Sequence, residues 1–334
     1  MPSGFTILLL IVLVLAVGFD YVNGFHDTAN AIATSVSTRA LRPHQAILMS
    51  ATANFLGALT GTAVAKTIAA GIANTPSGDA GQIVVAAALV GGITWDLITW
   101  RLGIPASSSH ALIGGLIGAA VAAGGLDALK PDGIAQKVLV PLVLSPFLGI
   151  TIGFIVMVVL LNAFRRMHPR RLNDRFRRLQ VLSAAFMSFS HGSNDAQKTM
   201  GIITLALVAG GVIAEPVVPL WVIILAATAI SLGTAGGGWR IIRTMGQRVV
   251  KLDPVHGFAA ETTAASVILG ASVFGMPVST THVISSAIMG VGASDRFSAV
   301  RWGVAGNIII AWILTLPASA AVAWIAWEVL SRVL

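Results

Sequence analysis

Two short polar stretches, each in the middle of a long apolar segment, constrain this chain more than any other feature. The first is Asn23-Gly24-Phe25-His26-Asp27-Thr28-Ala29-Asn30, inside residues 5–38, and the second is His191-Gly192-Ser193-Asn194-Asp195-Ala196-Gln197-Lys198, inside residues 179–211. They align at Gly24/Gly192 and at Asp27/Asp195, 168 residues apart. A carboxylate at bilayer depth costs about 2.5–3.5 kcal/mol on insertion scales. A chain that carries two of them is expected to use them to bind an ion or a substrate.

The composition predicts a polytopic membrane protein. Of the 334 residues 56% are hydrophobic and 10% are charged, whereas about a quarter of a soluble domain is charged. The net charge of +8 could suit nucleic acid, but Lys and Arg gather in the turns between apolar segments, as they do in cytoplasmic loops. We therefore expect the lipid bilayer, and no nucleic acid, as a partner. The absence of cysteine excludes disulfides, thiolate metal sites and thiol nucleophiles.

Both apolar segments are too long to form one simple span. As a continuous helix, residues 5–38 would extend about 50 Å, against a hydrocarbon core of about 30 Å. We expect the helix to be interrupted or bent near Gly24, and residues 179–211 to solve the same problem in the same way. An unwound backbone there would offer carbonyl groups to a cation. No basic region or cleavage site marks the first segment as a signal peptide, so we expect a retained span.

A second pair of motifs follows in each half. Gly103-Ile104-Pro105-Ala106-Ser107-Ser108-Ser109-His110 and Gly275-Met276-Pro277-Val278-Ser279-Thr280-Thr281-His282 carry Gly, Pro, Ser and His in the same places. Each opens an apolar stretch too short to span comfortably, which is typical of a re-entrant or discontinuous helix. Pro followed by Ser or Thr in the first turn directs free N–H groups and hydroxyls beyond the helix terminus, where they can bind an anion. The alternative is an ordinary N-cap.

The order of these motifs predicts an internal duplication. The first copy covers residues 1–164, the second covers 179–334, and a loop with seven arginines, residues 165–178, joins them. About five crossings in each copy would invert the second relative to the first. With the basic loop in the cytoplasm, sixteen of the twenty-one Lys and Arg fall on that side. We expect an all-α protein of the cell (inner) membrane with two inverted repeats, each including a broken helix and a short re-entrant helix, and with both termini outside.

The candidate site residues fall into three groups. Carboxylates repel phosphate-like anions, so Asp27 and Asp195 are expected to hold a coupling Na⁺ or to carry a proton. Their expected helpers are Asn23, Asn194 and Glu261. The expected oxyanion contacts are Asn30, Ser107, Ser108, Ser109, Gln197, Lys198, Ser279, Thr280 and Thr281, although Lys198 can equally pair with Asp195. The third group is four histidines, His26, His110, His191 and His282. We expect them to form hydrogen bonds that support the site rather than to transfer protons, but a role as proton carriers stays open. No cofactor is expected.

These motifs resemble the duplicated signature of the inorganic phosphate transporter (PiT) family, bacterial branch. The resemblance is carried by residues 24–31, residues 192–196 and the two Pro-x-Ser-x-x-His segments, and it covers the whole chain. It implies a phosphate symporter driven by Na⁺ or H⁺, usually a dimer, with phosphate at the interface of the inverted repeats. Animal members carry an acidic residue where this chain has Ala58, while their second-half glutamate matches Glu261. The coupling ion therefore stays open, with Na⁺ favoured.

Three other functions are compatible with parts of the sequence. Members of the same family that carry sulfate or a metal–phosphate complex share these motifs. An intramembrane phosphate-ester hydrolase could use Ser107, His110 and Asp27. We do not expect an enzyme, because catalysis needs one asymmetric site whereas alternating access needs two related halves. A passive anion channel is disfavoured, since the carboxylates would obstruct an anion.

Overall fold

The computed structural model describes residues 6–333, and within them the chain is helical and forms no β-strand. The first half contains α1 (Ile7–Ser37), α2 (Pro43–Ala58), α3 (Ala63–Gly71), α4 (Asp79–Leu102), α5 (Ser108–Gly124), α6 (Pro131–Ile134) and α7 (Val140–Ala163). The second half contains α8 (Pro169–Ala209), α9 (Leu220–Gly236), α10 (Trp239–Arg243), α11 (Pro254–Val273), α12 (Thr280–Asp295) and α13 (Trp302–Val333). Over the same residues, four helices, or six if each bent pair is one span, are long and apolar enough to cross a membrane. The expected all-α polytopic class is confirmed.

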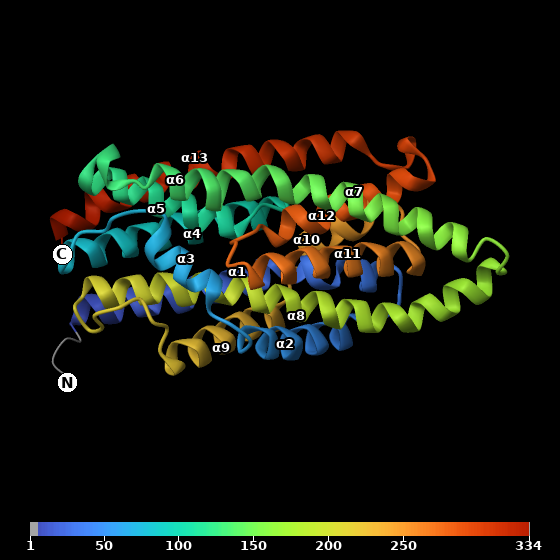
Figure 1. Cartoon of the computed structure of the whole chain (residues 1–334), viewed down its shortest axis with the longest axis horizontal. Helices are drawn as coiled ribbons and strands as arrows, with labels where there is room; N and C mark the ends of the chain where they lie inside the picture. Colours follow the sequence, from blue (N-terminus) through green and yellow to red (C-terminus); the bar gives the residue numbers. More distant parts are fainter. Residues whose placement is uncertain (1–5, 334) are drawn as a thin grey trace.

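The two halves follow one plan in opposite orientations. Figure 1 shows the start of α1 and the end of α13 at the same end of the molecule, and the connection from α7 to α8 at the other. As a result α1 and α8, which carry Asp27 and Asp195, run in opposite directions through the centre. This arrangement is the inverted repeat that the duplicated motifs predict.

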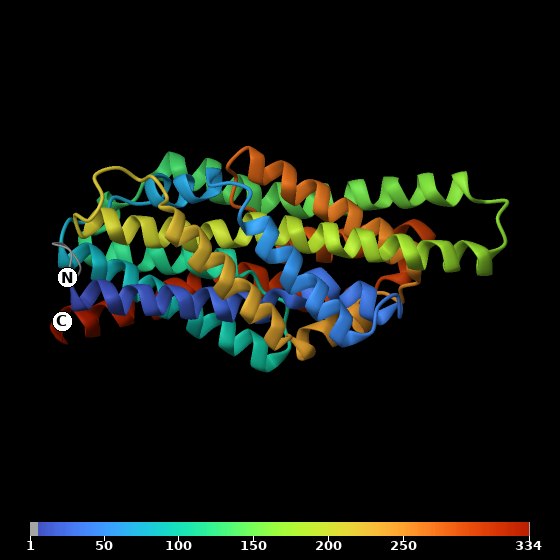
Figure 2. The same ribbon diagram turned by 90° about the horizontal axis from the view of Figure 1, so that it is seen from below.

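The breaks in the helices lie elsewhere than expected. α1 and α8 are continuous through Gly24 and Gly192, as their unbroken ribbons in Figure 2 show. The breaks come one helix later, where α2 and α3 bend by 69° and the helices of Leu220–Gly236 and Trp239–Arg248 bend by 61°. The prediction of unwound backbone beside Asp27 and Asp195 is therefore wrong, since the carbonyl groups there belong to regular helix.

Gly24 and Gly192 have a different use, which is close helix packing. A Cβ atom on Gly24 would lie 2.3 Å from the carbonyl oxygen of Ile230 in α9. A Cβ atom on Gly192 would lie 2.1 Å from the carbonyl oxygen of Asn54 in α2. Small residues let membrane helices approach to backbone contact. The two halves are thus interlocked by equivalent crossings, α1 on α9 and α8 on α2.

The basic segment between the halves is mostly helical rather than a loop. Of residues 165–178, only those before Pro169 lie outside a helix, and α8 begins there. Pro169 occupies the first turn, the His168 side chain accepts a hydrogen bond from the Arg170 N–H, and arginine favours helix. α7 and the start of α8 therefore form a helical hairpin that projects beyond the other helices, on the right in Figure 2.

The two short helices begin at the predicted motifs. α5 has 17 residues and α12 has 16, and their N-caps are Ser107 and Ser279. Each cap hydroxyl accepts the backbone N–H of the histidine three positions later, at 3.2 Å. Equivalent sequences therefore start equivalent helices in both halves, as expected.

Candidate ion and anion site

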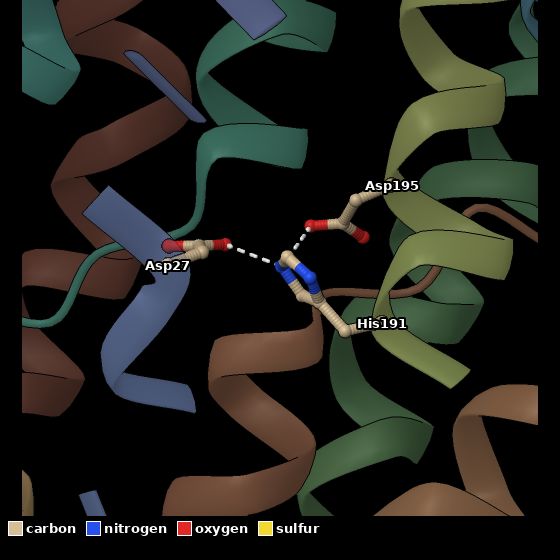
Figure 3. Close-up of side chains that lie close together, drawn as sticks. All are labelled: Asp27, His191 and Asp195. Atoms are coloured by element: carbon tan, nitrogen blue, oxygen red, sulfur yellow. Dashed lines mark ion pairs between the residues drawn. The ribbon is translucent and has the colours of Figure 1, made fainter. Parts of the chain in front are cut away.

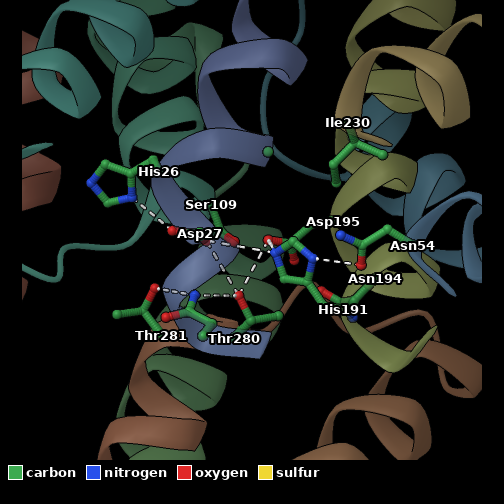
Figure 4. A network of polar contacts seen from close by, with 12 residues as sticks. His26, Asp27, Asn54, Ser109, His191, Asn194, Asp195, Ile230, Thr280 and Thr281 are labelled. Carbon is green, nitrogen blue, oxygen red and sulfur yellow. Dashed lines mark hydrogen bonds and ion pairs between the residues drawn. The ribbon is translucent and has the colours of Figure 1, made fainter. Parts of the chain in front are cut away.

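The N-termini of α5 and α12 meet in the centre of the molecule, beside the polar stretches of α1 and α8. Ser109 of α5 donates a hydrogen bond to the carbonyl of Val278, which precedes α12, at 3.4 Å. The rings of His110 and His282 lie 4.8 Å apart, centroid to centroid. Asn30 of α1 donates to Thr281 Oγ1 at 2.9 Å. Figure 4 shows that all four motifs contribute to one polar network.

Asp27, His191 and Asp195 form the centre of this network (Figure 3). His191 Nε2 lies 3.3 Å from Asp195 Oδ2 and 4.0 Å from Asp27 Oδ2. One ligand atom from each of the three residues lies within 4.8 Å of the others, and all three side chains are buried. The geometry is compact enough for a single ion to contact all three.

The tautomer of His191 leaves this cluster short of a hydrogen-bond donor. His191 Nδ1 lies 3.1 Å from Asn54 Oδ1, and the Asn54 amide nitrogen donates to Thr234 at 2.8 Å, which orients the amide. Nδ1 therefore carries the proton in a neutral His191, and Nε2 has none. Nε2 then faces two carboxylates that can only accept. A cation or an extra proton between them satisfies all three groups.

Asp27 has a second histidine on its other side. His26 Nδ1 lies 2.7 Å from Asp27 Oδ1, and its Nε2 lies 3.0 Å from Thr99 Oγ1. Thr99 donates its own proton to the carbonyl of Trp95 at 3.0 Å, so it accepts from the histidine. His26 is therefore placed to donate from both nitrogens, which suits an imidazolium paired with Asp27.

Lys198 pairs with Asp195 as His26 pairs with Asp27. Its ammonium is buried and contacts Asp195 Oδ1, Ser109 Oγ and, at 3.0 Å, the carbonyl of Val278. The ion pair with Asp195 that the sequence allowed is thus present, and the same ammonium also reaches the start of α5. A positive charge beside a helix N-terminus reinforces the attraction of that terminus for an anion.

Thr280 links the two aspartates. Its hydroxyl lies 3.2 Å from Asp195 Oδ2 and 3.4 Å from Asp27 Oδ2. The caps Ser107 and Ser279 use their oxygen lone pairs for backbone N–H groups, as the N-cap alternative expects, and this leaves their protons for donation. Ser108 Oγ is buried without a partner in the described part of the chain.

Two of the expected site residues, Gln197 and Glu261, lie apart from this network, and a third, Asn194, lies in it (Figure 4) but bonds to α11. Gln197 accepts from the Val64 N–H at 2.8 Å and donates to the carbonyl of Ser193 at 2.6 Å, at the break between α2 and α3. Asn194 donates to Ser272 at 2.8 Å. Glu261 forms a separate buried group, whose other members are Thr34, Gln180 and Ser183.

Two buried carboxylates escaped the sequence interpretation. Asp20 in α1 and Asp96 in α4 are both 0% exposed, and none of their carboxylate oxygens has a hydrogen-bond partner among residues 6–333. The sequence could have indicated both residues, because each is an acidic residue within an apolar segment, where a charge is costly. Asp96 lies close to the end of its span and Asp20 outside the repeated motif, so neither stood out.

Known proteins are similar to this chain along almost all of its length. The model of the phosphate transporter family matches residues 23–323. A Bacillus subtilis (strain 168) protein named "Probable low-affinity inorganic phosphate transporter" is 48% identical over 328 residues, which are 98% of each chain. A Rhizobium meliloti (strain 1021) protein of the same name is 47% identical, over 94% of each chain.

A solved structure, "The sodium-dependent phosphate transporter", is similar in fold. The two superpose with a TM-score of 0.91 at 27% sequence identity, over 98% of this chain and 100% of that one. The relatives are transporters, so the protein is not an enzyme. With the family model matched across both repeats and relatives near half identity over nearly the whole length, this chain belongs to the phosphate transporter family.

Proposed function

We propose that this protein is a secondary active symporter that imports inorganic phosphate by alternating access, with Na⁺ as the coupling ion. The observation that carries the proposal is that His191 Nε2, which has no hydrogen-bond partner among the described residues, faces Asp27 and Asp195 at 4.0 and 3.3 Å. The names of the relatives support phosphate as the substrate, and the name of the solved structure supports Na⁺.

The coupling ion is placed between the two aspartates. Asp27 Oδ2 and Asp195 Oδ2 both face the hydroxyl of Thr280, at 3.4 and 3.2 Å. Three oxygens that converge from α1, α8 and α12 suit a hard cation. A proton on His191 would satisfy the same groups, and it is the competing form of coupling.

Phosphate is placed at the N-termini of α5 and α12. Lys198, Ser109 and the free N–H groups of α5 supply donors on one side, and Asn30 with Thr281 supplies them on the other. The carboxylates of Asp27 and Asp195 are paired with His26 and Lys198, but their oxygens still repel a nearby anion. A cation bound at Asp27 and Asp195 removes that repulsion, so each ligand favours the binding of the other.

The same proposal includes the orientation in the membrane. The arginine-rich hairpin of α7 and α8 lies in the cytoplasm and both termini lie outside, because basic residues stay on the cytoplasmic side. The two interlocked halves then open the central site alternately to each side. The functional unit is a homodimer, as the family resemblance implies.

Transport by purified protein in liposomes tests the coupling ion. An inward Na⁺ gradient at equal pH is expected to concentrate labelled phosphate, whereas a pH gradient alone is not. Sulfate in excess is expected to compete weakly, and liposomes without protein give the background. Uptake that follows the pH gradient and ignores Na⁺ would overturn Na⁺ coupling and transfer the role to the central histidines, His26 and His191.

A further inference from the structure

The hairpin that joins the two halves carries positive charge that no described residue balances. Residues 165–178 contain seven arginines and one aspartate. All seven arginines are exposed, and none forms an ion pair with a carboxylate among residues 6–333. None of them belongs to the central site. So many like charges on one short segment repel one another and attract an anion from solution.

Part of this charge surrounds a cavity. The cavity has a volume of about 480 Å³, and its charged or polar lining residues are Arg166, His168, Arg171 and Arg175, which we call the arginine pocket. A second cavity of about 250 Å³ continues it along α8, because Arg171 and Arg175 line both. Cavities of roughly 300–1,000 Å³ are the usual size for small-molecule sites. The arginine pocket is therefore large enough for a ligand rather than for a single water molecule.

The arginines reach the pocket from two sides. Arg171 and Arg175 are four positions apart in α8, which places them on one face of the helix. Arg166 comes from the turn that follows α7. His168 is the N-cap of α8, where the helix dipole adds positive charge. Guanidinium groups bind phosphate oxygens with two parallel hydrogen bonds, so several of them suit a ligand with several phosphoryl groups.

The distance of the pocket from the central site excludes lipid headgroups as its natural ligand. Arg175 and Arg171 precede Asp195 by 20 and 24 residues of α8, or about 30 and 36 Å along the helix. A bilayer with its headgroups is about 40–45 Å thick, so its surface lies about 20–22 Å from the midplane, where transporter sites form. Figure 2 shows the same hairpin beyond the other helices. The ligand therefore comes from the aqueous solution.

We propose that the arginine pocket is a regulatory site for a soluble ligand with a short chain of phosphoryl groups, such as inorganic tripolyphosphate or a nucleoside triphosphate. The pocket faces the cytoplasm in the orientation of the proposed function, and its effect on transport rests on that function. A cell builds such compounds from the phosphate that it imports. Their binding here reports that phosphate is sufficient.

A ligand in the pocket connects the two halves where the chain passes from one to the other. Arg166 follows the last helix of the first half, and Arg171 lies in the first helix of the second. Phe164, which also lines the cavity, packs against Phe176 at 5.4 Å between ring centroids, and Phe176 packs against Phe258 of α11 at 5.2 Å. Alternating access moves the halves relative to each other. A ligand that ties them together therefore slows phosphate import.

Calorimetric titration of the purified full-length protein with tripolyphosphate and with ATP tests the site. The protein is held in nanodiscs of neutral lipid at one salt concentration, since salt screens exposed charges. Wild type is expected to bind both ligands in competition, and R171Q/R175Q is expected to bind them about tenfold more weakly or worse. R170Q/R177Q is the matched control, because it removes two charges from the same turns at positions that do not line the cavity. It is expected to bind nearly as tightly as wild type.

The binding measurements have clear contrary outcomes. Wild-type protein that binds neither ligand, or ATP but not tripolyphosphate, would overturn recognition of a phosphoryl chain. Equal weakening in the two double variants would overturn the pocket and leave only a general attraction by the basic segment. If nanodiscs that contain phosphatidylglycerol abolished binding, lipid headgroups would occupy the cavity, and a soluble ligand would be excluded. Thermal unfolding confirms that each variant is folded, as expected for exposed side chains.

Phosphate uptake into liposomes tests the regulation. With tripolyphosphate on both faces, Na⁺-driven uptake is expected to slow in wild type and in R170Q/R177Q, and to stay unchanged in R171Q/R175Q, each relative to the same protein without tripolyphosphate. Equal slowing in R171Q/R175Q would overturn the regulatory role, because the ligand would then act at the central site. Wild type that shows no Na⁺-driven uptake even without tripolyphosphate would overturn the proposed function instead, while the titrations would still decide whether the pocket binds.

Discussion

The polar stretches of α1 and α8 make equivalent contacts with unequal charges. Lys198 of α8 reaches Ser109 at the start of α5, and Asn30, its equivalent in α1, reaches Thr281 at the start of α12. The first contact is made by an ammonium group and the second by an amide. Both halves thus place position-matched donors at the short helices, but only the second half brings a permanent positive charge.

The same inequality holds for the aspartates themselves. Asp195 pairs with Lys198, whereas Asp27 pairs with His26, whose charge depends on a proton. The duplication therefore supplies a symmetric scaffold, and a few substitutions make the site asymmetric. Alternating access needs the scaffold, since each half takes its turn, while one phosphate ion needs a single set of donors. Four sets of variants test this interpretation.

The largest difference is expected between D195N and D27N. Both should abolish gradient-driven phosphate uptake, because each removes a carboxylate proposed to bind the coupling ion. D195N also leaves the buried Lys198 ammonium without a carboxylate partner, which costs about 3–5 kcal/mol of folding free energy. D27N should cost less, because His26 can release its proton. Thermal unfolding in detergent measures both, and D195N/K198M is expected to recover stability without recovering uptake. Equal losses of stability would contradict the asymmetry.

The two helix crossings, α1 on α9 and α8 on α2, should lose similar stability when a methyl group is added at the crossing glycine. G24A and G192A each place a Cβ atom against a backbone carbonyl, at 2.3 and 2.1 Å, and such overpacking costs about 1–3 kcal/mol. Gly18→Ala on α1 is the control, because a Cβ there meets no described atom within 4 Å. The unfolding temperature should fall similarly in the two variants and stay level or rise in the control. If G24A lowered the unfolding temperature and G192A did not, the two crossings would not be equivalent.

The donors at the short helices should differ in their effect on phosphate affinity. S109A removes a hydrogen bond to the charged Lys198, worth about 1.5–3 kcal/mol, whereas T281A removes one to the neutral Asn30, worth about 0.5–1.5 kcal/mol. The phosphate concentration at half-maximal uptake should therefore rise more in S109A. T52A, at an exposed hydroxyl bonded only to its own helix, should not change it. A larger effect of T281A would assign the main anion contacts to α12.

The features that the sequence predicted correctly depend on neighbouring residues, and those it missed depend on distant ones. The starts of α5 and α12 follow from Pro105 and Pro277 with their Ser caps, which act within one helical turn. The sequence around Gly24 does not tell whether the glycine interrupts its helix or lets another helix pack closely against it. Its partner, Ile230, is in the other half of the chain, so the break was expected in the wrong helix.

The smallest difference is expected at the first turns of α4 and α11, which are equivalent helices. Asp253 caps α11 by accepting from the N–H groups of Val255 and His256, at 2.9 and 3.1 Å. His256 then contacts Asp253 Oδ1 at 2.7 Å and Asp295 Oδ2, at the end of α12, at 2.8 Å. In the described chain, Gly78, the N-cap of α4, makes no side-chain cap bond. Only the second half thus ties its short helix to the preceding one by charge.

The effect of this contact should depend on pH. Partial burial raises the pKa of Asp253, but the hydrogen bonds and charge of His256 and the bond from the Val255 N–H outweigh it and hold the pKa below its usual value. A lowered pKa stabilises the fold at neutral pH, and this contribution is lost as pH falls through the folded pKa, below about 4. D253N keeps a good cap and loses the charge, whereas D253A also loses the cap, which is worth about 0.5–2 kcal/mol. At pH 7 the unfolding temperature should therefore fall in the order wild type, D253N, D253A, and at about pH 3.5 the gap between the first two should be narrower. A gap between wild type and D253N that is the same at both pH values would show that the charge of Asp253 does not stabilise this end of α11.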